Sequence, residues 1–258
     1  MKPKVQIFKD ISELSLAAAE IFVETSSQAI AQRGQFLISL SGGGTPNHLY
    51  QLLASEPYHD RVDWTKVHVF WGDERCVPTD DPGSNYFQAR QALLDHVKIP
   101  AGNIHRVVSD PSTSSGRRLE PASAALDYAQ TLKDFSAPPL EWPRFDLVLL
   151  GMGDDGHTAS LFPGSPVEVS SPTIAVTANY QDRPANRVSL TPMVFNSARK
   201  VIFLVTGLGK AVTLTQVLSD ISIMDLLPAQ RIQPSDGELL WLVDEAAASK
   251  LEISDRGL

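Results

Sequence analysis

Short apolar runs alternate along the chain with longer stretches in which apolar residues recur every three or four positions. The first pair is a run at 5–8 followed by 11–33, whose apolar residues have the spacing of one helix face. Asp10 stands where a helix N-cap belongs, and Gly34 stands where a helix commonly ends. This pattern predicts a strand and then a long, capped helix.

The same alternation continues to the last part of the chain. Strands that are apolar throughout and alternate with helices are typical of parallel sheets with both faces covered. The predicted fold is therefore α/β, with an open, mainly parallel sheet covered by helices on both faces. We predict further strands at 36–40, 67–71, 145–150, 173–177, 201–206 and 239–243, and further helices at 47–54, 85–97 and 122–135.

One domain accounts for residues 1–258. The sequence shows no internal repeat and no change of composition, and 258 residues is an ordinary length for one α/β unit. The stretch at 109–121 is rich in Ser, Pro and Gly, which predicts an exposed loop inserted in this domain.

The charge balance narrows the choice of partner. The chain has 22 Lys and Arg against 30 Asp and Glu, a formal net charge of -8. A nucleic-acid binder needs a basic surface, so we expect no nucleic-acid partner. A small anionic ligand stays compatible, because a few cations in one cleft can outweigh a diffusely acidic surface.

Cysteine usage and hydropathy indicate a cytoplasmic protein. Cys76 is the single cysteine, so no internal disulfide can form, and we interpret it as a buried structural thiol. The N-terminal stretch lacks the apolar core of a signal peptide, and no apolar run reaches the roughly 18 residues of a membrane span. Metal-ligand spacings of His, Cys or acidic residues are absent, so we expect no metal and no cofactor.

Polar and glycine-rich segments follow four of the predicted strands. They read SGGGTP after Leu40, GDER after Trp71, GMGDDGH after Leu150 and GLGK after Thr206. Ligands of open parallel sheets bind beyond the carboxyl ends of the strands. We therefore predict one site assembled from these four distant segments.

The segment SGGGTP has the features of an anion-binding loop. Gly42, Gly43, Gly44 and Thr45 lead from a buried strand into a helix whose first turn holds Pro46, a residue suited to the first helical position. Glycines allow the backbone N–H groups to approach an anion, and the helix N-terminus favours negative charge. A tight turn that merely needs positive φ is the simpler alternative, but one glycine would suffice for it. The spacing does not match a Walker A loop.

The segment GMGDDGH supplies a candidate general base. It formally matches the GxGxxG dinucleotide fingerprint, but Asp154 and Asp155 would face a pyrophosphate, and Pro163 interrupts the helix that should hold it. We therefore reject that match. His157 follows a strand end among glycines and carboxylates, and imidazole titrates near neutrality, so we expect it to be catalytic rather than an ordinary surface histidine.

Two further groups complete the predicted site. Asp73 and Arg75 lie at the neighbouring strand end, where an exposed charged turn is the alternative interpretation. Arg187 and Lys210 are cations that could bind a phosphate together with the glycine loop, Arg by bidentate contact and Lys as a point charge. Each alone would be an ordinary surface residue.

Together these segments resemble an ordered set of family motifs. The sequence contains SLSGGGTP, VFWGDERCVP followed by GSNY, FDLVLLGMGDDGHTASLFPGS, RVSLTP and VTGLGKA, in this order. They are similar to those of the 6-phosphogluconolactonases, lactone hydrolases of the oxidative pentose phosphate pathway. The resemblance runs from about Val5 to the last strand, and DGHTASLFPG is its most specific part. It implies a modified Rossmann-like fold of the isomerase/deaminase type.

The resemblance also marks two departures and two rival functions. Gly44 stands where the family often has Ser, so that Thr45 alone would offer a hydroxyl to the phosphate. Glucosamine-6-phosphate isomerase/deaminases carry a further acidic residue shortly after DGH, whereas TASLFPG has none before Glu168, which disfavours that activity. A non-catalytic sugar-phosphate sensor would normally carry a helix-turn-helix, for which we expect no room ahead of Val5.

The resulting hypothesis is hydrolysis of a small sugar-phosphate lactone, 6-phospho-D-glucono-1,5-lactone. The phosphate would bind the glycine loop with Arg187 and Lys210, and His157 would activate water. Arg75 or backbone N–H groups would stabilise the oxyanion. Either Asp155 or Asp73 would orient His157, and the sequence does not choose between them. We expect a monomer.

Overall fold

A parallel sheet forms the centre of the molecule in the computed structural model, which describes residues 4–109, 120–136, 138–166, 169–180, 183–219 and 226–251. Within these residues, seven strands pair in parallel throughout. Their order across the sheet is β1 (Lys4–Phe8), β10 (Glu238–Asp244), β9 (Lys200–Val205), β6 (Leu147–Leu150), β2 (Phe36–Leu40), β3 (Val67–Trp71) and β5 (Ile104–His105). The predicted open parallel sheet is confirmed.

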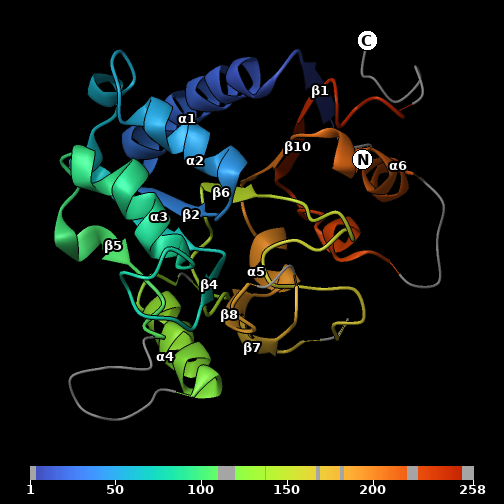
Figure 1. Ribbon diagram of the computed structural model, residues 1–258. Coiled ribbons are helices and arrows are strands. Elements are labelled where there is room, and N and C mark those ends of the chain that lie inside the picture. The colour runs from blue at the N-terminus through green and yellow to red at the C-terminus, as the bar shows by residue number, and fades with distance from the viewer. Residues whose placement is uncertain are drawn as a thin grey trace.

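Helices cover both faces of this sheet (Figure 1). Alternate residues of each strand face opposite sides: Ile38 and Leu40 pack in one buried cluster, and Leu37 packs in the other. Burial of each such side chain contributes about 1.5–3 kcal/mol. One cluster contains residues of α1 (Ile11–Arg33), α2 (Gly44–Leu53) and α3 (Asn85–Ala92), and the other those of α4 (Pro121–Lys133), α5 (Pro192–Asn196) and α6 (Ala211–Leu218).

Helix α1 begins and ends where the sequence predicts. The Asp10 side chain accepts hydrogen bonds from the N–H groups of Ser12 and Glu13 at 2.9 and 3.0 Å, which satisfies two donors of the first turn. Gly34 ends the helix with φ 76°, a conformation that favours glycine.

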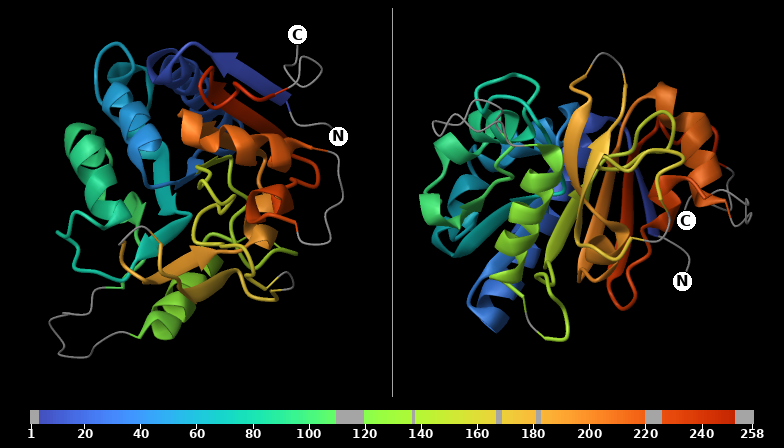
Figure 2. Two further views of the ribbon diagram at one scale, coloured as in Figure 1. Left: turned by 45° about the vertical axis from the view of Figure 1, so that its right-hand side comes forward. Right: turned by 90° about the horizontal axis from the view of Figure 1, so that it is seen from below.

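A second, antiparallel sheet packs beside α4 (Figure 2) and is a feature that the sequence analysis missed. In the described part of the chain its strands are β4 (Asp73–Arg75), β8 (Asn186–Leu190) and β7 (Thr173–Thr177), in that order. The strand predicted at 173–177 thus belongs to this small sheet. Strands β4 and β8 carry charged residues, so neither has the apolar pattern on which the prediction relied.

Two predicted helices have different bounds in the structure. Helix α2 begins at Gly44 rather than at the predicted 47, so Pro46 stands at the third helical position, within the first turn as expected. Proline fits there because the N–H groups of a first turn lack partners within the helix. Helix α3 ends at Ala92, short of the predicted 97. Single 3-10 turns occur at His59–Arg61, Trp64–Lys66, Leu94–His96, Ala101–Asn103, Leu208–Lys210 and Pro228–Arg231.

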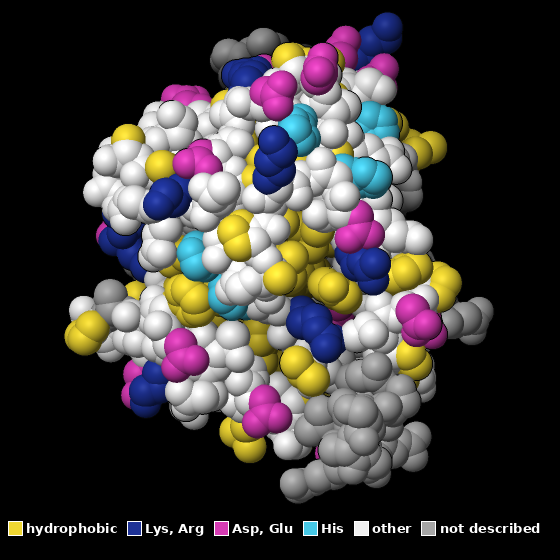
Figure 3. Space-filling model, turned by 90° about the vertical axis from the view of Figure 1, so that its left-hand side faces the viewer, with side chains coloured by type: hydrophobic (Ala, Val, Ile, Leu, Met, Phe, Trp, Pro, Cys, Tyr) yellow, Lys and Arg dark blue, Asp and Glu magenta, His cyan; other side chains and the backbone are white. Residues whose placement is uncertain are grey.

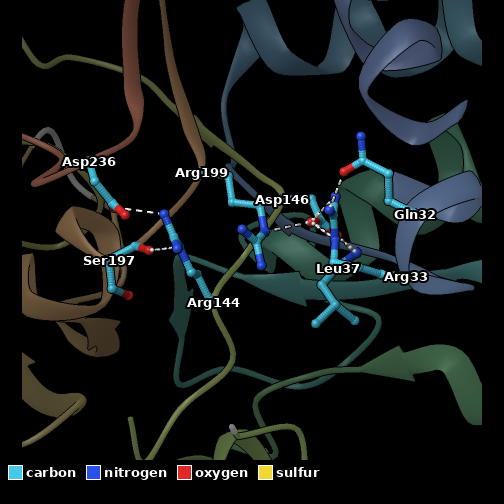
Figure 4. A network of polar contacts seen from close by, with 8 residues as sticks. All are labelled: Gln32, Arg33, Leu37, Arg144, Asp146, Ser197, Arg199 and Asp236. Carbon is cyan, nitrogen blue, oxygen red and sulfur yellow. Dashed lines mark hydrogen bonds and ion pairs between the residues drawn. The ribbon is translucent and has the colours of Figure 1, made fainter. Parts of the chain in front are cut away.

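Asp146 joins several elements at the end of the sheet opposite the predicted site (Figure 4). It lies just before β6 and is buried. Its carboxylate accepts hydrogen bonds from Arg33 Nε at 3.0 Å and from the N–H of Leu37 at 2.9 Å, and Arg199 Nε lies 3.3 Å away. One side chain therefore links the end of α1 to the starts of β2, β6 and β9.

Membrane spans, metal sites and two predicted segments can be compared with the structure only within the described residues. Every helix in the described ranges is too short or too polar to cross a bilayer. Within the same ranges, no group of three or more His, Cys, Asp or Glu side chains is arranged to hold a metal ion. Residues 110–119 of the predicted loop at 109–121, and Glu168, lie outside the described residues.

Candidate active site

Four neighbouring strands, β9, β6, β2 and β3, carry the four segments that the sequence analysis singled out. The chain order reverses between β2 and β6, and the crevice at such a switch point is where open α/β sheets bind ligands. A cavity of about 200 Å³ lies there. Its lining includes Gly42, Gly43, Gly44, Thr45, Asp73, Arg75, Gly153, His157, Tyr180, Arg183, Arg187, Thr206 and Lys210. Every predicted site residue except Asp155 therefore contributes to one cavity.

The glycine loop places the N-terminus of α2 at the cavity. Gly43 is the N-cap, with φ 113°, and Gly44 and Thr45 form the start of the first turn, whose N–H groups have no partners within the helix. A Cβ atom on Gly42 would lie 1.8 Å from Asn85 Oδ1, so this position admits only glycine in this packing. The Thr45 and Thr206 hydroxyl oxygens are 2.7 Å apart. This geometry suits an anion.

His157 is held from the side of its Nδ1 atom. Nδ1 lies 2.6 Å from Asp155 Oδ1, which also accepts the backbone N–H of His157 at 3.1 Å. Gly156 has φ 81°, and the N–H of Gly153 donates to the carbonyl of His157 at 2.8 Å. With Nδ1 facing a carboxylate, Nε2 is the nitrogen that can take a proton from a ligand.

Burial and the nearby carboxylates act on the pKa of His157 in opposite directions. Desolvation lowers its pKa below the ordinary value and is the largest effect; the Asp155 hydrogen bond and charge oppose it. The side chain is only 14% exposed. The imidazole is therefore neutral over a wider pH range than a solvent-exposed histidine, as a general base requires.

The two candidate carboxylates have different partners. Asp155 contacts His157 directly, whereas Asp73 accepts hydrogen bonds from Ser160 Oγ at 2.6 Å and from Asn85 Nδ2 at 3.2 Å. Asp73 acts on His157 through its charge, which raises the pKa of the imidazole. The contact geometry therefore favours Asp155 as the group that orients His157.

Arg75 and Arg187 face each other as a cross-strand pair of β4 and β8. Arg187 is 2% exposed, and its Nε donates to the carbonyl of Pro184 at 3.0 Å. Arg75 donates from Nη1 to the carbonyl of Gly83 at 2.7 Å. Among the described residues, neither the buried Nε of Arg75 nor the buried Nη2 of Arg187 has an acceptor. Buried donors of this kind usually have a partner, so both can bind an anion at the cavity.

Lys210 already has a carboxylate beside it. Its Nζ lies 2.5 Å from Asp154 Oδ1, a pairing that the sequence analysis did not predict. Its charge is therefore partly compensated before a ligand binds, which makes Lys210 a weaker anion attractor than the free cation we expected.

Several residues of the site were not recognised from the sequence. Tyr180 and Arg183 reach the cavity from the loop between β7 and β8, and Thr206 from the end of β9. Asn85, part of the quoted GSNY segment, contacts Asp73 and closes against Gly42. The strand-end position of Thr206 and the quoted GSNY segment are the signals that could have identified two of these four residues.

Cys76 lies outside the cavity lining and is partly buried rather than fully buried as predicted. Burial raises the pKa of its thiol to about 11. The thiol is therefore protonated at neutral pH, which agrees with the interpretation that it is not a nucleophile.

Comparison with known proteins gives consistent matches over the whole chain. A family model for glucosamine-6-phosphate isomerases/6-phosphogluconolactonase matches residues 9–241. The 6-phosphogluconolactonase of Nostoc sp. is 41% identical over 254 residues, 98% of this chain and 100% of that protein. That of Mycobacterium tuberculosis is 38% identical over 252 residues, 97% of this chain and 99% of the other.

Solved structures extend these matches to the fold. The 6-phosphogluconolactonase from Trypanosoma cruzi is 31% identical, covers 97% of both chains and superposes with a TM-score of 0.83. A monomeric glucosamine-6-phosphate deaminase is 22% identical, with a TM-score of 0.78 over 96% of this chain and 99% of its own. The second match concerns the fold alone.

Proposed function

Because the chain belongs to the family of glucosamine-6-phosphate isomerases and 6-phosphogluconolactonases, we infer that its cavity hydrolyses 6-phospho-D-glucono-1,5-lactone to 6-phospho-D-gluconate. The chain is a hydrolase, and the reaction belongs to the oxidative pentose phosphate pathway. One observation carries the mechanism proposed below: His157, held by Asp155, lines the same cavity as a helix N-terminus suited to phosphate.

The proposed binding mode places the substrate phosphate on the glycine loop. Free N–H groups at the start of α2 and the hydroxyl of Thr45 donate to the phosphate oxygens. Arg187 offers the buried donor described above, and Lys210 adds charge while sharing it with Asp154. The lactone ring then extends across the cavity towards His157.

The proposed chemistry is attack of water on the lactone carbonyl. Nε2 of neutral His157 takes a proton from water as the water oxygen bonds to C1, while Asp155 stabilises the imidazolium that forms. The carbonyl oxygen becomes an oxyanion, to which Nε of Arg75 donates. The bond from C1 to the ring oxygen then breaks, and imidazolium returns its proton to that ring oxygen.

The decisive experiment compares His157→Asn with the wild type. With lactone generated in situ, we expect kcat above the spontaneous rate to fall by about 10²- to 10⁴-fold, because the variant keeps the side-chain shape but lacks the base. His59→Asn is the matched control: His59 also pairs with an aspartate, Asp60, at 2.7 Å, but lies outside the cavity lining. Wild-type turnover by His157→Asn would contradict the assignment of the base.

The same preparation tests the rival reaction. Ammonia release from glucosamine 6-phosphate would indicate an isomerase/deaminase, and we expect none, because the turn after His157 carries Phe162 and no acidic residue at 158–166. Failure of the wild type to accelerate lactone hydrolysis would favour a non-catalytic sensor.

We propose in addition that the protein is a cytoplasmic monomer whose partner is this small-molecule substrate. The single cysteine is free, which supports a reducing compartment. The net charge of -8 disfavours nucleic acid.

A further inference from the structure

The ring of Phe162 contacts two functional groups of the cavity. Its centroid lies 4.6 Å from that of the His157 imidazole, with an angle of 30° between the planes, which is a stacked arrangement. The guanidinium carbon of Arg187 lies 5.2 Å from the same centroid. One apolar ring therefore packs against both the proposed base and a proposed phosphate ligand.

Tyr180 covers a second part of the imidazole. Its ring meets His157 edge-on, with centroids 4.6 Å apart and an angle of 76°, and it lies 5.8 Å from Phe162. Offset-stacked and edge-to-face contacts of this kind are the favoured geometries of aromatic pairs. The two rings therefore contribute to the low exposure of the histidine.

The backbone around Phe162 is tied at several points. The N–H of Phe162 donates to Ser165 Oγ at 2.9 Å, and the N–H of Ser165 donates to the carbonyl of Phe162 at the same distance. The preceding Leu161 is buried and pairs with Thr158 in an isolated bridge. The backbone that carries the ring is thus fixed by its own turn.

We propose that Phe162, together with Tyr180, is a positioning residue for the lactonase reaction: its ring fixes the plane of the His157 imidazole and shields the face that it covers from bulk water, while Nε2 stays open to the reacting water. The same ring also contacts the Arg187 guanidinium. This inference rests on the proposed role of His157 as general base. Neither aromatic residue touches the reacting atoms in this mechanism, and both act through His157.

Charged and titratable groups surround His157 from several elements. Asp155 and Asp73 favour the imidazolium, Lys210 disfavours it, and burial has the largest effect and lowers the pKa of His157. Removing a ring admits water and lets this pKa rise towards its ordinary value. The charged and titratable groups around His157 come from five segments: Asp155 on the same turn, Asp73 on β4, Lys210 after β9, Tyr180 on the loop after β7, and Arg187 on β8, which contacts the Phe162 ring.

The experiment measures kcat/KM from pH 5 to 9 for the wild type, Phe162→Leu and Phe162→Ala, together with an NMR titration of the His157 imidazole without substrate. The base is active when neutral, so the acid limb of the profile follows the pKa of His157. For Phe162→Ala we expect the pKa of the acid limb and the pKa of His157 measured by NMR to rise together by roughly half a unit to one unit. Phe162→Leu should shift both pKa values less, because the leucine side chain still shields the imidazole from bulk water.

Phe135→Leu provides a matched control. Phe135 also packs on a histidine, with its centroid 4.5 Å from His105, but it lies outside the cavity lining. Its substitution should leave the pH profile unchanged. The proposal would be overturned if Phe162→Ala lost the same fraction of kcat/KM at every pH while the acid-limb pKa and the NMR pKa of His157 stayed unchanged. It would also be overturned if the pH profile of this variant equalled that of the wild type.

The two hypotheses can fail separately. If His157→Asn keeps full activity, the proposed base is wrong, whatever Phe162 does. If that variant is inactive and the His157 titration is the same in Phe162→Ala as in the wild type, the base stands and the role of Phe162 is refuted.

Discussion

The imidazole of His157 occupies space that only a glycine at position 153 leaves free. A Cβ atom on Gly153 would lie 2.0 Å from His157 Nδ1 and 2.6 Å from Asp155 Oδ1. The contact that orients the base therefore depends on a missing methyl group in the neighbouring turn. At this scale, the glycines of GMGDDGH serve side-chain packing as well as the turn itself.

Gly153→Ala should therefore impair catalysis more than folding. Gly153 has no positive φ, so alanine adds no backbone strain, and the methyl group must displace the imidazole. Because a displacement of about 1 Å can cost roughly 100-fold, we expect kcat to fall by about that factor with KM nearly unchanged. Steady-state kinetics and a thermal melt test this.

The control for that variant is Gly102→Ala. A Cβ atom there meets nothing within 4 Å, and Gly102 lies outside the cavity lining. Wild-type kcat is expected for it. Equal kcat in Gly153→Ala and the wild type would show that the imidazole can move without loss.

At the scale of elements, Asp146 adds polar contacts between the end of α1 and the starts of β2 and β9 (Figure 4). Its Oδ2 accepts the N–H of Leu37 at the second residue of β2, and its Oδ1 faces the arginine that ends α1. The nearby ion pair of Arg144 and Asp236, at 2.7 Å, shares the same surface but is more exposed.

Asp146→Ala should lower the free energy of unfolding by about 2–3 kcal/mol, because it leaves the buried N–H of Leu37 without an acceptor and removes the partner of Arg33. Asp236→Ala is the comparison: its side chain is 66% exposed, and loss of such a pair costs less than about 1 kcal/mol. Urea unfolding of both variants measures the difference. Equal costs would refute a special role for Asp146.

The whole molecule is held together across its two sheets. Val188 and Leu190 of the small sheet belong to the same buried cluster as Val148 and Phe203 of the large sheet. Figure 3 shows acidic and basic side chains interspersed on the face over α3 and α4, with hydrophobic side chains across its middle.

We predict that both sheets unfold in one transition, as expected for the single domain of 1–258. Tryptophan fluorescence of a variant with Trp64→Phe and Trp142→Phe, which keeps the buried Trp71 and Trp241, reports the large sheet. Reactivity of the free Cys76 thiol, next to β4, reports the small one. Since one cluster spans both sheets, the two urea midpoints should coincide. Distinct midpoints would divide the chain into two folding units.

The sequence by itself determined six strands of the large sheet, the bounds of α1 and the location of the site. Apolar runs, the Asp10 cap and Gly34 are local signals, because neighbours along the chain satisfy the same backbone groups. Four polar segments at strand ends placed His157 and the glycine loop in one crevice, because carboxyl ends of parallel strands share an edge. The GSNY segment was noted without a role.

Only the tertiary structure decided which groups meet. Asp155 rather than Asp73 contacts His157, Lys210 pairs with Asp154, and Phe162 covers the base. These contacts depend on side-chain directions and on packing between segments distant in sequence, such as Ser160 against Asp73. Periodicity and turn chemistry describe neighbours along the chain, so they carry no information on such pairs.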